Sequence, residues 1–351
     1  MPAVQAMRSM RLSIAGFIFG RSYPFSGPTV TIMMVMKLAG IGLIAICVLA
    51  VGVATQPPLG AGAQPPRVAR LVAIGDLHAD VDGARRAFRL AGAIDERDAW
   101  IGGNLVVVQT GDFIGRGSED RAMLDFLLDL QARAKAAGGT LHLLIGNHEV
   151  FAARLDHRWV HPDAFAAFND IPGLDLRQKA LAGLPPGERA RGAALMPGGR
   201  YARQLAAFPT VLRVGDTIFA HGGVLPMWAK HGIDRINTEV REWLMGRTAE
   251  PASAQGLDDG SADDGVMWSR HFAVDEFVQA CAVLKESLSI LRAKRMVVAH
   301  TRQPTITSRC QDQVWAIDVG ISRYYGGDLQ VLEIVDDRQV RIVSPHGGTE
   351  K

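Results

Sequence analysis

Five short apolar runs in this chain each end in residues of the types that bind metal ions. The clearest is segment 144–150, Leu-Ile-Gly-Asn-His-Glu-Val, where the apolar run stops at Gly146 and polar residues follow without a helical pattern. Open α/β folds present their chemistry in this way, because the carboxyl ends of buried parallel strands meet along one edge of a sheet. The metal-binding residue types that follow the five runs are Asp76, His78, Asp112, Asn147, His221 and His300.

The segments between these runs predict an α/β fold. From residue 68 onward the expected strands alternate with amphipathic helices, which is the rhythm of a layered sheet. Residues 151–208 consist of aromatic-rich helical pieces interrupted by proline and glycine, so we expect a cap insertion that shapes substrate choice. Residues 250–265 are rich in aspartate and predict a mobile polar loop. Helices are expected at 81–91, 123–137 and 284–291, and late strands at 314–318 and 329–343.

Residues 1–63 differ in character from the rest of the chain. Lys37 precedes an uncharged apolar run over 38–54, and Ala61-Gly-Ala63 has the small-residue pattern of a cleavage site before Gln64. We therefore expect an export signal. The alternative is a retained membrane anchor through residues 38–54, although this run is slightly short for a span of about 20 residues. Either interpretation makes residues 64–351 an exported catalytic domain, periplasmic or secreted.

Charge and cysteine content bear on nucleic-acid binding and on disulfide bonds. The chain has 38 basic and 36 acidic residues, so its net charge of +2 gives no reason to expect nucleic acid as a partner. Its three cysteines are too few for a disulfide scaffold. Cys281 and Cys310 could pair in an oxidising compartment, but we expect two buried free thiols.

The residue types at the strand ends predict a centre with two divalent metal ions. Two such ions roughly 3.5–4 Å apart need a shared anionic oxygen, and Asp112 is the expected bridge. Asp76 and His78, separated by one residue, can hold one ion together with it. The mixture of carboxylate, amide and imidazole groups suits manganese, iron or zinc. A water shared by both ions would lose a proton near neutral pH and become the nucleophile. The second ion would be held by Asp112, Asn147, His221 and His300.

In order and spacing, these segments resemble the signature blocks of the calcineurin-like metallophosphoesterases, and within them the phosphoprotein phosphatase branch. The matching blocks are 75–78, 111–117, 146–149, 221–223 and 299–301. Four further stretches are similar to the Shewanella-like protein phosphatases, at 160–168, 197–203, 265–270 and 317–322. The resemblance extends from about residue 70 to 335. It implies a four-layer α/β/β/α sandwich with two mixed β-sheets.

The resemblance also implies roles for individual residues. The six residues at the strand ends match the family's ligands, in the two groups given above. His148 matches the general acid that protonates the leaving oxygen, and Arg116 matches the arginine that grips the phosphate. Arg270 is a second phosphate ligand by analogy. Tyr324 and Tyr325 could line the pocket or simply pack. The implied activity is phosphomonoester hydrolysis on phosphoproteins, with a preference for phosphotyrosine.

One departure from the family pattern affects the proton donor. Gly115 stands where the family has an aspartate that orients the acid histidine, so His148 should be a poorer acid. General acid catalysis is typically worth about 10²–10⁴-fold, and a phenolate leaving group tolerates its weakening best. Glu119 or Asp120 could substitute for the missing carboxylate. Two alternatives stay open: hydrolysis of small phosphates or dinucleoside polyphosphates, and a phosphate-binding protein that has lost catalysis.

Overall fold

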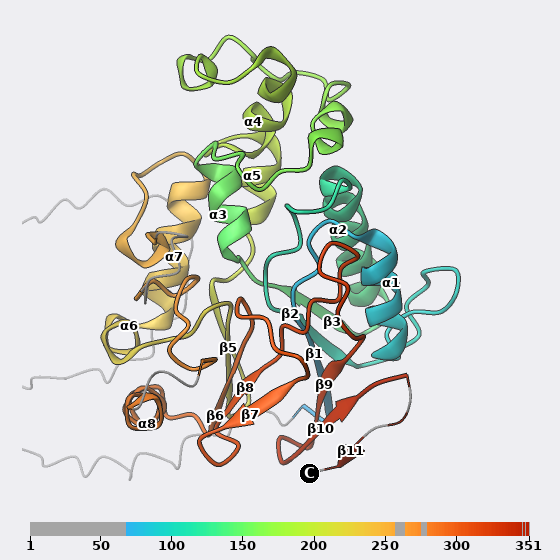
Figure 1. Cartoon of the computed structure of the whole chain (residues 1–351), viewed down its shortest axis with the longest axis vertical. Coiled ribbons are helices and arrows are strands. Elements are labelled where there is room, and N and C mark those ends of the chain that lie inside the picture. Colours follow the sequence, from blue (N-terminus) through green and yellow to red (C-terminus); the bar gives the residue numbers. More distant parts are fainter. Residues whose placement is uncertain (1–67, 257–263, 275–278, 346, 348, 351) are drawn as a thin grey trace, which may run out of the picture. The chain divides into compact units, whose positions relative to one another are not determined.

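The computed structural model describes residues 68–256, 264–274, 279–345, 347 and 349–350 (Figure 1). The predicted export signal or anchor within residues 1–63 lies outside this range. In the part of the chain that the structure describes, no helix combines the length and the apolar character needed to cross a membrane.

Two mixed β-sheets form the centre of the fold. The first has the strand order β11-β10-β9-β1-β2-β3 and the second has the order β4-β5-β6-β8-β7. Within the first sheet β1, β2 and β3 are parallel, and within the second β5, β6 and β8 are parallel, while the remaining pairs are antiparallel. The first sheet consists of β1 (Arg70–Ile74), β2 (Val106–Gln109), β3 (Thr140–Leu143), β9 (Val331–Val335), β10 (Gln339–Val343) and β11 (Thr349–Glu350). The second consists of β4 (Val211–Val214), β5 (Thr217–Ala220), β6 (Arg295–Val298), β7 (Thr307–Arg309) and β8 (Val314–Ala316).

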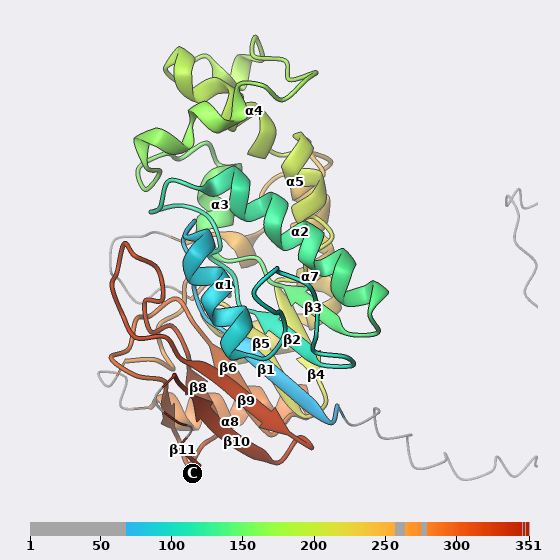
Figure 2. The same cartoon turned by 90° about the vertical axis from the view of Figure 1, so that its right-hand side faces the viewer.

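Helices cover the outer side of each sheet. Helices α1 (Val81–Leu90) and α2 (Asp120–Ala136) lie on one side in Figure 1 and in front of the strands in Figure 2. Helices α6 (Pro226–His231), α7 (Ile233–Leu244) and α8 (Ala280–Leu291) lie on the opposite side. Strands β5 and β6 are buried along their whole length, as expected for strands covered on both faces. This arrangement confirms the predicted sandwich with two mixed sheets.

The starts of three helices differ from the prediction. The residues after Gly146 were expected to have no helical pattern, but Asn147 begins helix α3 (Asn147–Ala153). The reason is local: the Glu149 carboxylate accepts the N–H of Gly146 at 2.8 Å and so satisfies a donor at the helix start. Helices α2 and α8 likewise begin three and four residues before the predicted starts, in turns without apolar periodicity.

The segment predicted as the cap lies at the top of Figure 1 and contains only short helices. Its interior side chains include Phe168, Leu181 and Tyr201, all of them buried. Its elements are η1 (Pro162–Ala164), η2 (Ala166–Phe168), η3 (Lys179–Leu181), η4 (Pro186–Glu188), α4 (Arg189–Leu195) and α5 (Arg200–Leu205).

One prediction about the second half was wrong, and one falls mostly outside the described residues. Residues 257–263 of the predicted mobile loop are not described; before them, η5 (Ala252–Ala254) contains buried residues, and the carbonyl of Ala254 accepts the indole N–H of Trp268 at 2.8 Å. Cys281 and Cys310 are not free thiols but form a disulfide, with a Cα–Cα distance of 5.2 Å. The turn between β7 and β8 carries Cys310 to helix α8, a juxtaposition that spacing in the sequence cannot show.

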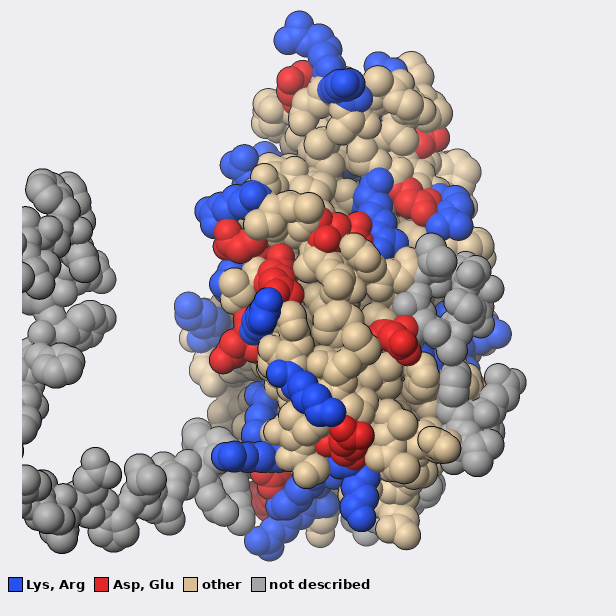
Figure 3. All heavy atoms as spheres, turned by 90° about the vertical axis from the view of Figure 1, so that its left-hand side faces the viewer, with Lys and Arg blue, Asp and Glu red and all other residues tan. Residues whose placement is uncertain are grey.

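One face of the described surface mixes charges of both signs. On the face shown in Figure 3, which lies on the left in Figure 1, basic and acidic side chains are interspersed rather than gathered in a patch of one sign. This distribution matches the nearly balanced charge of the chain.

Candidate active site

The carboxyl ends of the parallel strands bring the predicted ligands together. Asp76 and His78 follow β1, Asp112 follows β2, and Asn147 follows β3, while the two histidines come from the second sheet, His221 after β5 and His300 after β6. Several of these residues have left-handed backbone conformations, which cost energy and are common in active sites. The φ angles are 44° at His78, 55° at Asp112, 68° at Arg116 and 64° at His300.

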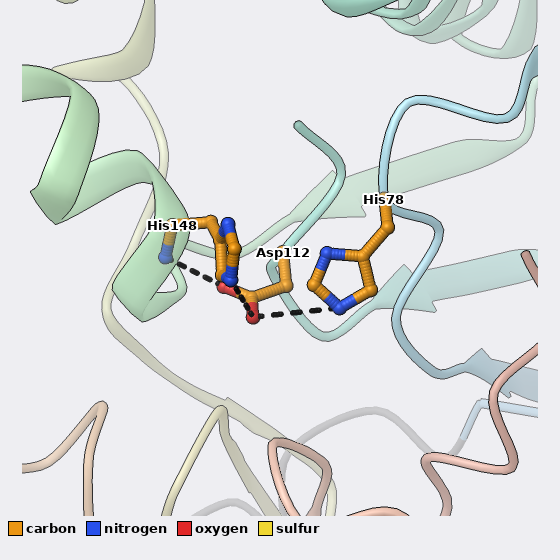
Figure 4. A group of neighbouring side chains, drawn as sticks. All are labelled: His78, Asp112 and His148. Carbon is orange, nitrogen blue, oxygen red and sulfur yellow. Dashed lines mark hydrogen bonds and ion pairs between the residues drawn. The ribbon is translucent and has the colours of Figure 1, made fainter. Parts of the chain in front are cut away.

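Asp112 lies at the centre of the group (Figure 4). Its Oδ2 is 3.9 Å from Nε2 of His78 and 4.0 Å from Nε2 of His148. Its Oδ1 is 3.3 Å from Nε2 of His221. Among the described residues, two sets of three side chains could each hold one ion, and Asp112 belongs to both; they are His78, Asp112 and His148, and Asp112, His221 and His300. The first set contains His148, the predicted acid, while the predicted ligand Asp76 lies beside it, with Oδ2 3.6 Å from Nε2 of His78. A carboxylate shared between two sets is the arrangement that a bridging ligand requires.

The Asn147 amide faces two of the other predicted ligands, His221 and His300. Its Oδ1 lies 2.9 Å from Nε2 of His221 and 3.0 Å from Nδ1 of His300. Nδ1 of His221 lies 3.0 Å from the carbonyl of Thr110, which can only accept a hydrogen bond, so Nε2 is the ring nitrogen that faces the amide. The opposite amide orientation would let Asn147 donate to the two histidines and to Asp112. In the orientation of the structure, the amide oxygen of Asn147 points toward the place where a cation would be bound.

Several buried carboxyl groups lie close together in the site. Burial raises the pKa of Asp76 well above its ordinary value, and the neighbouring Asp318 carboxylate adds to the rise. Burial also opposes ionisation of His221, but Asp112 and Asp76 outweigh it and raise its pKa to about 9. Oδ1 of Asp76 and Nδ1 of His78 are buried without hydrogen-bond partners among the described residues. Divalent cations would supply the positive charge and the partners, so the residues fit a metal pair.

Glu149 holds the two ligand-bearing loops together. Its carboxylate accepts hydrogen bonds from four backbone N–H groups of the described residues, and these belong to both loops. Burial raises the pKa of Glu149 to about 7, and the nearby Asp112 carboxylate contributes, while the N–H donors favour the charged form. The donors are Gly146 at 2.8 Å, Asp112 at 2.9 Å, Phe113 at 3.1 Å and Ile114 at 3.3 Å.

The ring of His148 occupies the space that a side chain at position 115 would need. A Cβ at this position would lie 2.2 Å from Nδ1 of His148, and the backbone φ is +78°. Neither candidate substitute supplies a carboxylate to the ring: Asp120 accepts the N–H of Gly115 and pairs with Arg191, and Glu119 binds Arg323. The structure therefore does not support the possibility that one of them replaces the family aspartate. Burial lowers the pKa of His148 to about 3.

The predicted arginines lie around the same pocket, which has a volume of about 230 Å³. Nη1 of Arg270 donates to the carbonyl of His300 and to Oγ1 of Thr301, both at 3.2 Å. Of the residues predicted for the site, His221 alone is not among those lining the pocket; its side chain is fully buried, with Nε2 2.9 Å from Oδ1 of Asn147. The lining consists of Asp76, His78, Asp112, Arg116, Asn147, His148, Arg270, His300, Arg302, Asp318 and Tyr325.

Three of these lining residues were given no role from the sequence. Asp318 follows strand β8, so the strand-end rule that identified the other acidic residues applies to it equally. Arg302 comes two residues after His300 and is exposed at the pocket. Tyr325, whose place was left open, contacts the ring of His78 at 5.2 Å between centroids.

Comparison with known proteins agrees with this geometry. A family model described as calcineurin-like phosphoesterase matches residues 69–252. The chain therefore belongs to the calcineurin-like phosphoesterase family, and it is a metal-dependent phosphoesterase.

Two relatives and one solved structure show which members of this family the chain is similar to. The chain is 38% identical over 308 residues to Shewanella-like protein phosphatase 2 of Arabidopsis thaliana, with 78% of this chain and 77% of that protein covered. It is 30% identical over 284 residues to Shewanella-like protein phosphatase 1 of Plasmodium berghei, covering 78% and 74%. A solved structure of the cold-active protein-tyrosine phosphatase of a psychrophilic Shewanella species shares the fold, with a TM-score of 0.64, 23% identity, and coverage of 81% and 80%.

Proposed function

We propose that this chain is a protein phosphatase that uses two metal ions and prefers phosphotyrosine. The observation that carries the proposal is the position of Asp112, which belongs to both sets of metal-binding side chains on the wall of a pocket that also contains arginines. Protein phosphatases among the similar relatives support a phosphoprotein substrate.

The proposed role of each site residue follows from the chemistry of its side chain. Asp76, His78 and Asp112 would hold one ion, and Asp112 would share the second with Asn147, His221 and His300. Manganese, iron or zinc suits these ligands. When bound, the ions would acidify a water to give the nucleophile and would neutralise charge on the phosphate. Arg116 and Arg270 present N–H donors to the phosphate oxygens, and His148 gives a proton to the leaving oxygen.

The surroundings of His148 support the proposed preference for phosphotyrosine. In the described part of the chain no carboxylate orients its Nδ1, and burial disfavours its protonated form. A weak acid is tolerated best by a phenolate, because the tyrosine hydroxyl has a pKa of only about 10 and needs little assistance to leave. A serine alkoxide is far more basic and needs the proton. Tyr325 at the pocket supplies an aromatic surface beside the site.

Two measurements test this proposal. Asp112→Asn keeps the shape of the bridge but removes its charge, so bound metal and turnover should both fall by more than the roughly 10–100-fold typical of outer-shell changes. The exposed Asp328→Asn is the matched control and should change neither. Undiminished metal content and turnover in Asp112→Asn would refute the two-metal site.

A peptide pair that differs only in the phosphorylated residue, tyrosine or serine, tests the preference. Faster hydrolysis of the phosphotyrosine peptide, abolished by a chelator, is expected. Equal rates would refute the preference, and faster cleavage of a dinucleoside polyphosphate in the same panel would move the assignment to small phosphates.

We also propose that the catalytic domain is exported. The apolar run and small-residue site before Gln64 support this, and so does the disulfide between Cys281 and Cys310, since such bonds persist in oxidising compartments. Mass spectrometry of the mature amino terminus is the test. A terminus at Gln64 supports cleavage, and an intact segment 38–54 contradicts it.

A further inference from the structure

We propose that Trp159, in the cap segment, is a positioning residue that holds Arg116 in the orientation needed to bind phosphate. This inference rests on the proposed function, in which Arg116 contacts the substrate phosphate. It gives the cap a role, which is to fix one of the phosphate-binding side chains.

Trp159 contacts both the side chain and the main chain of Arg116. The guanidinium carbon Cζ lies 3.8 Å from the centroid of the indole ring, closer than to Tyr324 at 5.5 Å or Tyr325 at 6.0 Å. The backbone N–H of Arg116 donates to the carbonyl of Trp159 at 2.7 Å. Because Arg116 has a φ of +68°, its conformation is one that a non-glycine residue rarely adopts unless other contacts hold it.

Stacking leaves the arginine free to bind an anion. A guanidinium packed on an aromatic ring uses its flat face, so the N–H donors around its edge stay available. Among the described residues no carboxylate forms an ion pair with Arg116, and its Nε is buried without a hydrogen-bond partner. Arg116 is thus a fixed and unneutralised cation on the wall of a pocket shared with Asp112 and His148.

The preceding residue is tied to the cap as well. The N–H of Gly115 donates to Oδ1 of Asp120 at 2.8 Å, and Oδ2 of Asp120 accepts from Nε of Arg191 at 2.7 Å. Arg191 lies in cap helix α4, and both members of this ion pair are buried. The cap therefore holds two consecutive residues of the phosphate-binding loop, through Arg191 on one side and Trp159 on the other.

The test compares phosphate binding in variants of the full chain loaded with metal. Trp159→Ala removes the stack, and Trp159→Leu removes it while keeping apolar volume in case the alanine variant does not fold. Trp159→Phe keeps an aromatic face. Phe126→Ala is the matched control, since Phe126 stacks with Arg85 at 5.4 Å between helices α1 and α2 and does not line the pocket. The readouts are the inhibition constant of inorganic phosphate, KM and kcat for an aryl phosphate, metal content and thermal midpoint.

We expect the alanine and leucine variants to raise the phosphate inhibition constant roughly five- to tenfold, with KM rising more than kcat falls and metal content unchanged. The phenylalanine variant should retain most of the binding, and Phe126→Ala all of it. In an Arg116→Ala background, removing the indole should have no further effect.

Two results would overturn the inference, and they are distinguishable. If loss of the indole weakens phosphate binding equally with and without Arg116, or does not weaken it at all, Trp159 does not act through Arg116. If Arg116→Ala itself leaves the inhibition constant unchanged, the proposed phosphate contact of Arg116 fails and the role of Trp159 fails with it.

Discussion

Replacing Glu149 with glutamine should destabilise the loops that carry the ligands. In the parent, Oε2 accepts from Gly146 and Asp112, and Oε1 accepts from Phe113 and Ile114. The glutamine amide has one oxygen, so its NH₂ group would face two buried N–H donors that it cannot accept. Each buried donor left unpaired costs about 1–3 kcal/mol, so the free energy of unfolding should fall by roughly 2–6 kcal/mol.

Urea unfolding of chelated protein measures this change directly, and bound metal is measured on the same preparations. Because the freed N–H groups belong to Asp112 and its neighbours, metal affinity should fall together with stability. The control is Glu286→Gln, which removes only an exposed ion pair with Lys230 and should cost no more than about 1 kcal/mol. Were Glu149→Gln to unfold within about 0.5 kcal/mol of the parent and keep its metal, the bracing role would be refuted.

Three further predictions follow from other contacts. Burial tends to raise the pKa of Glu333, but Arg341 and Arg70 hold it below its ordinary value. Its contribution to stability is therefore complete above the unfolded pKa of about 4.3 and is lost as the pH falls through the folded pKa. Glu333→Gln should weaken this loss of unfolding free energy at acidic pH, measured by urea unfolding at graded pH. An unchanged dependence of the unfolding free energy on pH would contradict the prediction. Gly115→Asp should lower turnover of aryl phosphates instead of restoring an acid, because its Cβ would displace His148; faster turnover of an alkyl phosphate would contradict this. The disulfide spans 29 residues, so Cys281→Ser should lower the free energy of unfolding by about 3–4 kcal/mol, and a reductant that destabilises the variant as much as the parent would argue against it.

Much of the site could be predicted because its residues follow a local rule. Asp112 or His221 can be recognised as a candidate ligand from a buried strand and the polar residue after it, without knowing what lies opposite. Parallel pairing then brings these strand ends to one place, whichever loops connect them. The same rule, applied to the run that ends in Asp318, identifies the acidic residue that was missed.

The sequence by itself determined the fold class, the strands and the residue types that gather at their ends, because hydrophobic periodicity and strand termination are properties of neighbouring residues. Only the tertiary structure decided how those residues are supported. The ring of His148 stands against Gly115, Asp120 is committed to Arg191, and Cys310 reaches Cys281. Each of these contacts joins residues far apart in the chain, so it depends on the paths of several loops at once, and no local pattern encodes those paths.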